Sequence, residues 1–318
     1  MLAKLLTAIS PAGARGRLST LIFHRVLAAP DPLFPEEVDA WRFDQICGWI
    51  RQWFNVLPLD EAVRRLAEQT LPARAMAITF DDGYEDNCSV ALPILQRHGL
   101  SATFFIATGF LDGGRMWNDT VIEAVRRTTR NELDLDRLAG GRLGRHDLTT
   151  VALRRAAIDR LLPQIKYLDI AERLGVVEQI GQAAGVALPT TLMMRSSQVQ
   201  TLQRGGMQIG AHTVSHPILA KLDERQARRE MADSKACLEQ LLDRPVTLFA
   251  YPNGKPGSDY SAASVALARA AGFAAGLSTV SGSATAKSDV FQLPRFTPWD
   301  RTRLRFGARL LLNLTRSP

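Results

Sequence analysis

The sequence predicts an α/β protein built as a single β/α barrel with a helical insertion. Short apolar runs rich in β-forming residues alternate with helical stretches, which is the pattern of parallel strands joined by helices. Polar and titratable residues follow the ends of several expected strands, where a barrel gathers its chemistry. The 318 residues contain no internal repeat and no low-complexity linker, so one domain accounts for the chain.

The first part of the chain alternates expected strands and helices. The strands are apolar and rich in β-branched or aromatic residues, whereas the helical segments place charged and apolar residues at helical spacing. In chain order the elements are a strand at 18–26, helices at 41–53 and 59–69, a strand at 75–80, a helix at 89–98 and a strand at 101–108. Gly99 suits the left-handed conformation that often follows a helix, so it marks the end of the fifth element.

Residues 111–189 interrupt this alternation. The stretch is rich in arginine, has helical spacing and offers no convincing strand, so we expect an inserted helical segment. The alternation then resumes with a helix at 196–204, a strand at 207–210, a helix at 223–242, a strand at 246–251, a helix at 261–271 and strands at 275–279 and 291–295. The barrel domain is therefore expected at 18–300, between an N-terminal extension at 1–17 and a tail at 301–318.

The composition argues against several classes of protein. The net charge is +7, but the arginines are spread along the chain without interleaved aromatic residues, unlike a nucleic-acid-binding platform. Cys47, Cys88 and Cys237 lie far apart, so neither a disulfide framework nor a thiolate zinc site is expected. No apolar stretch reaches the length of a membrane span, and the N-terminus is a poor secretory signal. These features predict a cytoplasmic protein, either soluble or peripheral to the membrane.

The tail at 301–318 mixes arginines with leucines. This mixture fits a basic amphipathic helix lying on anionic lipid. It fits equally well a closing helix that packs on the domain and keeps its arginines in solvent. Both alternatives stay open at the level of the sequence.

Two short motifs supply the parts of a metal-dependent hydrolase. Asp81 and Asp82 follow the strand at 75–80, and His212 and His216 follow the strand at 207–210. Two imidazoles and one carboxylate can hold a divalent ion such as zinc, and the imidazoles would face the same side if their loop makes a helical turn. Asp82 is the expected third ligand, which leaves Asp81 as the base that takes a proton from water.

A hydrolase that releases an amine also needs a proton donor. Of the five histidines, two are assigned to the metal, His98 lies at an expected helix C-terminus and His146 lies in the insertion. His24, at the end of the first expected strand, is therefore the candidate general acid.

The two motifs resemble those of the polysaccharide deacetylase family, the NodB-homology domain also called carbohydrate esterase family 4. Residues 79–83 resemble the T-F-D-D-G motif and residues 212–217 resemble the H-T-x-x-H-P motif, and the resemblance spans most of 18–297 outside the insertion. It implies a distorted (β/α)7 barrel that hydrolyses N-acetyl groups on amino sugars, or less often O-acetyl groups, using zinc, cobalt or nickel. It also implies the roles given above to Asp81, Asp82, His212 and His216.

The third motif departs from the family pattern. Where the family has R-x-P-Y, this chain has an alanine at 250 and Asn253 in place of the tyrosine. We expect the Asn253 backbone N–H to bind the oxyanion, with Tyr251 beside it, and Arg295 to replace the missing arginine that steadies the catalytic aspartate. The family's C-terminal histidine motif is also absent. The chain in this respect resembles exopolysaccharide deacetylases that carry the acid histidine on the first strand after an aromatic residue, as in Phe23-His24.

The sequence therefore predicts a metal-dependent hydrolase that removes N-acetyl groups from amino sugars of a polysaccharide or its precursor, with zinc the first choice of ion. The expected partner is an acetylated amino-sugar polysaccharide or a lipid-linked saccharide, and peripheral membrane contact through the tail stays open. Two alternatives stay open. One is a deacylase or deformylase of a lipid-linked amino sugar or other small amide, and the other is a catalytically silent carbohydrate-binding barrel.

Overall fold

The computed structural model describes residues 2–298 and 300–316, and the chain divides into two compact units. The larger unit is drawn from residues 1–29, 38–112 and 194–318, and the smaller unit from residues 30–37 and 113–193. Every residue that the sequence singles out for catalysis or metal binding belongs to the larger unit.

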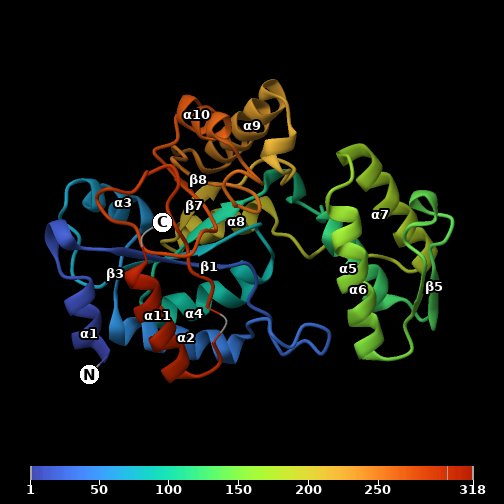
Figure 1. Ribbon diagram of the computed structural model, residues 1–318, viewed down its shortest axis with the longest axis horizontal. Coiled ribbons are helices and arrows are strands. Elements are labelled where there is room, and N and C mark those ends of the chain that lie inside the picture. Colours follow the sequence, from blue (N-terminus) through green and yellow to red (C-terminus); the bar gives the residue numbers. More distant parts are fainter. Residues whose placement is uncertain (1, 299, 317–318) are drawn as a thin grey trace. The chain divides into compact units, whose positions relative to one another are not determined.

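A curled parallel sheet forms the centre of the larger unit (Figure 1). Its strands are β1 (Leu18–Phe23), β2 (Asn55–Val56), β3 (Ala75–Phe80), β4 (Thr103–Ile106), β7 (Gln208–Ala211), β8 (Leu248–Ala250) and β9 (Ala275–Leu277). They lie in the order β1-β3-β4-β7-β8-β9, with β2 paired to β3 as well, and every pairing is parallel. Because the strands are parallel, their C-terminal ends lie along one edge of the sheet.

The segment 293–296 joins the two outer strands of this sheet. Leu293 forms a parallel bridge with β9, and Phe296 forms one with β1. The Phe296 N–H donates to the Thr20 carbonyl at 2.7 Å. Pro294 has no N–H to donate, which explains why the strand expected at 291–295 forms separate bridges and not a continuous ladder. The sheet thereby closes into the distorted barrel that the sequence predicts.

Alternation of side chains along β3 separates the inside of the barrel from the outside. Phe80 stacks between Phe23 of β1 and Phe104 of β4, with ring centroids 5.3 and 4.7 Å apart, and this aromatic row packs against Phe43 of α2 (Ala40–Trp53) on the outside. Neighbouring side chains on a strand point to opposite faces, so the residues flanking Phe80 point inward. The outward aromatic row thus fixes the register that turns Asp81 toward the barrel interior.

Gly210 on β7 leaves room inside the barrel for the ring of a neighbouring aromatic residue. A Cβ at this position would overlap the ring of Phe105, which belongs to the inner cluster of apolar side chains together with Leu248 and Ala250. The close approach explains a glycine immediately before the histidine motif.

Helices cover the outside of the sheet. Besides α2 they are α1 (Leu2–Ile9), α3 (Leu59–Ala67), α4 (Leu92–His98), α8 (Ser196–Arg204), α9 (Glu224–Leu242), α10 (Ala262–Ala270) and α11 (Arg303–Thr315). Several have capping residues of common types: the Asp39 carboxylate accepts from the Arg42 N–H at the start of α2, and Gly99 ends α4 at φ 62° as expected. None of the helices in the described residues combines the length and the apolar composition that crossing a membrane needs.

The two ends of the chain form helices of the larger unit. Helix α1 lies in the extension expected at 1–17, of which residue 1 is outside the described residues. Helix α11 lies in the tail expected at 301–318, of which residues 317–318 are outside them. Phe306, Leu310 and Leu314 of α11 are fully buried, so the apolar face of this helix packs on the barrel unit.

The smaller unit has its own core. Helices α5 (Trp117–Arg127), α6 (Val151–Lys166) and α7 (Ile170–Ala184) bury apolar side chains together, and the strands β5 (Glu132–Asp134) and β6 (Arg145–Asp147) form an antiparallel pair. The expectation that this part of the chain contains no strand is wrong. Each strand has only three residues and one buried side chain, which is too short for a periodic signal.

Candidate metal centre and catalytic site

The C-terminal ends of the strands bring the predicted polar residues together. His24 follows β1, Asp81 and Asp82 follow β3, and His212 follows β7. His216 lies further along the loop that begins at His212. The closing segment that bridges β9 and β1 supplies one more polar side chain, an arginine described below.

Asp82, His212 and His216 form a group that can hold a metal ion. Their ligand atoms all lie within 4.8 Å of one another, and the Asp82 Oδ1 atom is 3.5 Å from His212 Nε2 and 3.4 Å from His216 Nε2. Two ligands bound to one ion at about 2.1 Å in a tetrahedron lie about 3.4 Å apart, so the spacing fits. The Asp82 Oδ1 atom is also buried and has no hydrogen-bond partner among the described residues. A buried oxygen without a donor is costly, and a cation would satisfy it.

Hydrogen bonding orients the first imidazole for this role. The His212 Nδ1 atom lies 2.7 Å from the Ala250 carbonyl oxygen, which can only accept, so Nδ1 carries the proton and Nε2 presents its lone pair. Ala250 stands at the end of β8, directly after the pairing of β7 with β8. The neighbouring strand thereby fixes the orientation of the first ligand.

The loop that carries His216 is not the helical turn that the spacing suggested. Thr213 and His216 both have left-handed backbone conformations, at φ 66° and 53°, and these two reversals bring the imidazoles to a ring separation of 4.8 Å. Glu230 of α9 holds the loop, because its carboxylate accepts from the Val214 N–H at 2.8 Å, the Ser215 N–H at 2.9 Å and the Ser215 hydroxyl at 2.6 Å. Nothing in the spacing of the motif pointed to Glu230.

Burial and charge set the protonation of the ligand group. Burial alone raises the pKa of Asp82, but the His216 and His212 imidazoles outweigh it and hold this pKa well below its usual range. Burial lowers the pKa of His216 to about 4, assisted by repulsion from His212, so the His216 imidazole is neutral at neutral pH. Burial lowers the pKa of His212, but Asp81 and Asp82 outweigh it and raise this pKa, so a metal ion would have to displace a proton from His212 while His216 is already neutral.

Asp81 lies beside this group but is held by a different partner. The Arg295 guanidinium forms two parallel hydrogen bonds with its carboxylate, of 2.7 and 2.8 Å. Both side chains are almost fully buried, with 2% of Asp81 and 1% of Arg295 exposed. Arg295 is in turn held by the Ser278 carbonyl at 2.8 Å and the Thr79 hydroxyl at 3.3 Å. The closing segment therefore supplies the arginine that is missing at position 250.

The same charges keep Asp81 ionised. Burial raises the pKa of this carboxyl, but Arg295, His212 and His24 together lower it by more, and the result lies below the usual range. Asp82 next to it adopts a left-handed conformation at φ 77°, so the two carboxylates leave the chain in different directions. Asp82 belongs to the ligand group, whereas the Asp81 Oδ2 atom lies 3.8 Å from His212 Nε2.

His24 is exposed at the edge of the site, close enough for its charge to act on both aspartates. Its backbone is held from the segment just after them: the Asn87 side chain donates to the His24 carbonyl at 2.9 Å, and the Asp86 carboxylate accepts from the Val26 N–H at 3.1 Å. Asp86 also pairs with Arg25 at 2.8 Å. The loop after β1 and the loop after β3 are thus joined by buried polar contacts that the sequence did not reveal.

Asn253 and Tyr251 take different positions. Asn253 has a left-handed backbone at φ 59°, its carbonyl accepts from the Thr279 hydroxyl at 2.8 Å, and its N–H has no acceptor among the residues that the structure describes. The Tyr251 ring is buried and stacks on Tyr260 with centroids 3.9 Å apart. Tyr251 therefore belongs to the outer core, and the structure does not bring its side chain to the site as expected.

The two remaining histidines lie elsewhere. His98 at the end of α4 pairs with Asp44 at 2.8 Å, and His146 is buried in the smaller unit with its Nε2 atom 2.8 Å from the Leu143 carbonyl. Neither side chain is part of the group around Asp82.

Comparisons with known proteins identify the family of the chain. A family model described as polysaccharide deacetylase matches residues 68–134 and 171–276, more than half of the chain. A provisionally named polysaccharide deacetylase of Bacillus subtilis (strain 168), YxkH, is 21% identical over 282 residues, which cover 88% of this chain and 70% of YxkH.

Solved structures share the fold. The Streptococcus pyogenes deacetylase PplD, in complex with acetate, has a TM-score of 0.62 at 20% identity, covering 95% of this chain and 99% of PplD. IcaB from Ammonifex degensii has a TM-score of 0.59 at 19% identity, covering 94% and 98%. A de-N-acetylase from Aggregatibacter actinomycetemcomitans has a TM-score of 0.57 at 14% identity, covering 88% and 94%.

Proposed function

Because this chain belongs to the polysaccharide deacetylase family, we propose that it is a metal-dependent hydrolase that removes N-acetyl groups from the amino sugars of a polysaccharide or its precursor. The observation that carries this proposal is the division of labour between two adjacent carboxylates. Asp82 joins the ligand group, whereas Asp81 stands next to it, ionised and held by Arg295. A binding protein would have no use for a second buried carboxylate at this place.

Each residue has a role in the proposed reaction. Asp82, His212 and His216 would hold a divalent ion, with zinc, cobalt and nickel as the candidates. When bound, such an ion supplies Lewis acidity, which polarises a carbonyl oxygen and makes water more acidic. Asp81 accepts the proton of the water that attacks the acetyl carbonyl, and Arg295 keeps its carboxylate ionised and correctly oriented.

The second half of the reaction needs a proton donor and an oxyanion site. The C–N bond of the acetamide breaks, acetate leaves, and His24 protonates the sugar nitrogen as it becomes an amine. The Asn253 N–H, which lacks an acceptor among the described residues, is available to donate to the developing oxyanion. A histidine at the end of the first strand is the arrangement that this chain shares, by resemblance, with exopolysaccharide deacetylases, and it supports our proposal of an extracellular polysaccharide or its precursor as the substrate.

A second candidate substrate is an amino sugar on a lipid carrier. It is favoured by helix α11, which exposes arginines and leucines on its outer side. Acetate or formate released from a polyprenyl-linked amino sugar faster than from a soluble oligomer would select this candidate.

The test of the proposal is acetate release by metal-free protein reconstituted with zinc, cobalt or nickel in turn. The substrates are oligomers of N-acetylated amino sugars with different linkages. We expect acetate from at least one oligomer with at least one ion, and none after a chelator is added or from the Asp81→Asn variant. Absence of acetate from every oligomer with all three ions would overturn the proposal in favour of a silent carbohydrate-binding barrel.

A further inference from the structure

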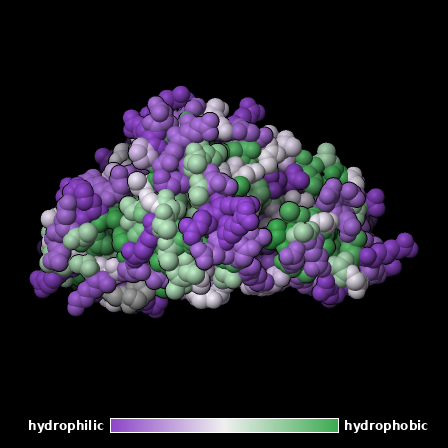
Figure 2. Space-filling view, turned by 90° about the horizontal axis from the view of Figure 1, so that it is seen from above, coloured by the Kyte–Doolittle hydropathy of each residue, from purple (hydrophilic) through white to green (hydrophobic). Residues whose placement is uncertain are grey.

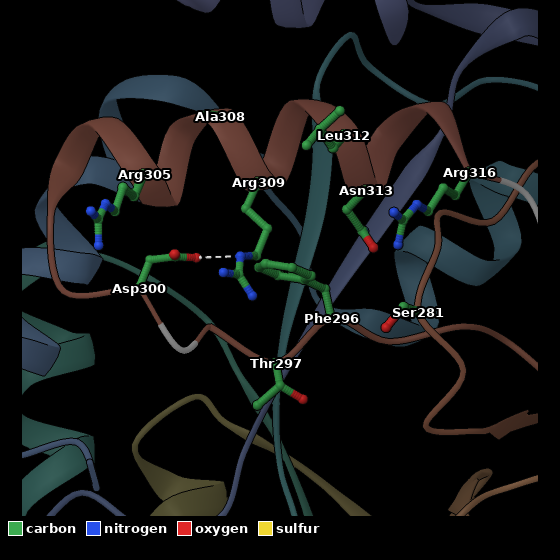
Figure 3. A pocket seen from close by; sticks show the side chains of 10 residues that line it. All are labelled: Ser281, Phe296, Thr297, Asp300, Arg305, Ala308, Arg309, Leu312, Asn313 and Arg316. Atoms are coloured by element: carbon green, nitrogen blue, oxygen red, sulfur yellow. Dashed lines mark ion pairs between the residues drawn. The ribbon is translucent and has the colours of Figure 1, made fainter. Parts of the chain in front are cut away.

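A pocket open to solvent lies beside helix α11, on the outside of the barrel. Its volume is about 650 Å³, and its walls include Phe296 of the closing segment and Asp300. Figure 3 shows Arg305, Arg309 and Arg316 reaching from one side of the helix toward this pocket. No residue assigned to the catalytic site lines it.

The pocket has more positive than negative charge. Arg309 pairs with Asp300 at 2.8 Å, and this carboxylate is buried. Arg305 and Arg316 are exposed, and neither pairs with a carboxylate within the described part of the chain. Two guanidinium groups are therefore available to an anion from outside.

Helix α11 is anchored, so this surface is a fixed part of the fold. Phe306 packs against Trp49 and Trp53 of α2, with ring centroids 5.7 and 6.3 Å apart, and Leu310 and Leu314 are fully buried. The usual apolar face of an amphipathic helix is thus already occupied by protein. The opposite side of α11 faces solvent.

That solvent-facing side carries apolar side chains among the arginines. Leu304 is 83% exposed and Leu312 is 60% exposed. In the described part of the larger unit, the other large exposed hydrophobic residues are Leu5 of α1 and Trp41 of α2. Helix α1 packs on both α2 and α11, so these residues belong to three neighbouring helices. Neither α1 nor α11 contains an acidic residue.

On a different side of the molecule, α9 and α10 contain none of the large exposed hydrophobic residues found in the described part of the chain. Figure 2 looks from above onto the side of α9 and α10, where hydrophilic side chains cover much of the surface and hydrophobic ones form small groups between them. The long helix α9 has acidic residues along its length and exposes Arg225 and Arg229 among them.

We propose that the surface formed by α11 and α1 docks on an anionic phospholipid bilayer. Arg305 and Arg316 bind the phosphates of the lipid headgroups, and Leu304 and Leu312 enter the boundary between headgroups and acyl chains. A dissolved phosphate would use the arginines but would leave the exposed leucines without a role. A bilayer uses both, because its anionic surface and its apolar interior lie within one side-chain length of each other.

Vesicle co-sedimentation tests this inference without depending on enzymatic activity. The full chain is mixed with phosphatidylcholine vesicles that contain or lack phosphatidylglycerol. We expect binding only to the vesicles with phosphatidylglycerol, and weaker binding as salt is added. The double variant Arg305→Gln/Arg316→Gln should bind about 30-fold more weakly, since each cation near an anionic surface contributes about fivefold. Leu304→Ser/Leu312→Ser should also weaken binding.

A matched control separates this surface from net charge. Arg225→Gln/Arg229→Gln removes the same charge from α9 and should bind the vesicles like the wild type. Equal losses in the two arginine pairs, or equal binding to neutral vesicles, would overturn the inference. So would saturable binding of inorganic phosphate that needs Arg305 and Arg316 while the leucine variant still binds vesicles fully. Circular dichroism of each variant confirms that the exposed substitutions leave the fold intact.

Discussion

The ion pair between Arg295 and Asp81 gives the sharpest test of the site by mutation. Arg295→Met removes the only guanidinium that contacts the Asp81 carboxylate among the described residues and replaces it with an apolar chain of similar length. The carboxylate stays in a place where only 2% of the residue is exposed. Breaking a buried pair in this way costs about 3–5 kcal/mol, because a buried charge loses its main compensating partner.

A second substitution should recover most of this loss. Leucine has nearly the shape of aspartate but carries no charge. The double variant Arg295→Met/Asp81→Leu therefore lacks both charges of the pair and fills a similar volume. Its free energy of unfolding should lie within about 2 kcal/mol of the wild type, the remainder being the hydrogen bond that Arg295 donates to the Ser278 carbonyl. Neither variant should release acetate, so the double variant should regain stability without regaining activity.

Urea unfolding of metal-free protein measures these differences, since a bound ion would itself compensate Asp81. Arg64→Met breaks an exposed pair with Glu68 and serves as the control, with an expected cost below about 1 kcal/mol. The reasoning is refuted if Arg295→Met is as stable as the control. It is also refuted if the double variant loses the sum of the two single losses, because the two charges would then act independently.

Three further predictions concern the acid, the metal loop and the barrel interior. His24→Ala should slow release of acetate from an acetylated amino sugar by about 10²–10⁴-fold yet barely affect hydrolysis of 4-nitrophenyl acetate, whose leaving group needs no proton; equal losses would argue against a proton donor. Glu230→Gln should weaken metal binding by about 10–100-fold in a chelator competition, because the loop carrying the second imidazole loses its anchor, whereas Glu224→Gln on the same helix should not. Gly210→Ala should destabilise the protein by about 1–3 kcal/mol in urea, since the new methyl group meets an aromatic ring, while Gly175→Ala in open space on α7 should be neutral or stabilising.

The parts of the fold that follow local patterns could be predicted from the sequence. The strand at 75–80 and the helix at 196–204 have the limits that were expected, because each is a regular run that ends at strong turn residues. Because parallel strands end along one edge of a sheet, the sequence also predicts that the motif residues following these strands lie at that edge. The smaller unit shows the limit of such patterns, since it also takes in residues 30–37, which lie far from the expected insertion in sequence.

The site contains features that only tertiary contacts produce. The histidine loop has two left-handed residues that are not glycine, a conformation that their own preferences oppose and that Glu230 stabilises from a distant helix. Asn87 and Asp86 likewise hold the backbone around His24 through contacts between two loops. Side-chain alternation does account for Tyr251: it shares the outer face with Phe249, two residues earlier, so its ring points away from the catalytic group.

The two adjacent aspartates are assigned different tasks, and one paired measurement tests this assignment directly. Metal content and acetate release are determined together for Asp81→Asn and Asp82→Asn after reconstitution with the ion that activates the wild type best. We predict that Asp81→Asn keeps one equivalent of metal and releases no acetate, whereas Asp82→Asn loses both. Loss of metal from Asp81→Asn, or acetate release that survives it, would contradict the assignment of Asp81 as the base.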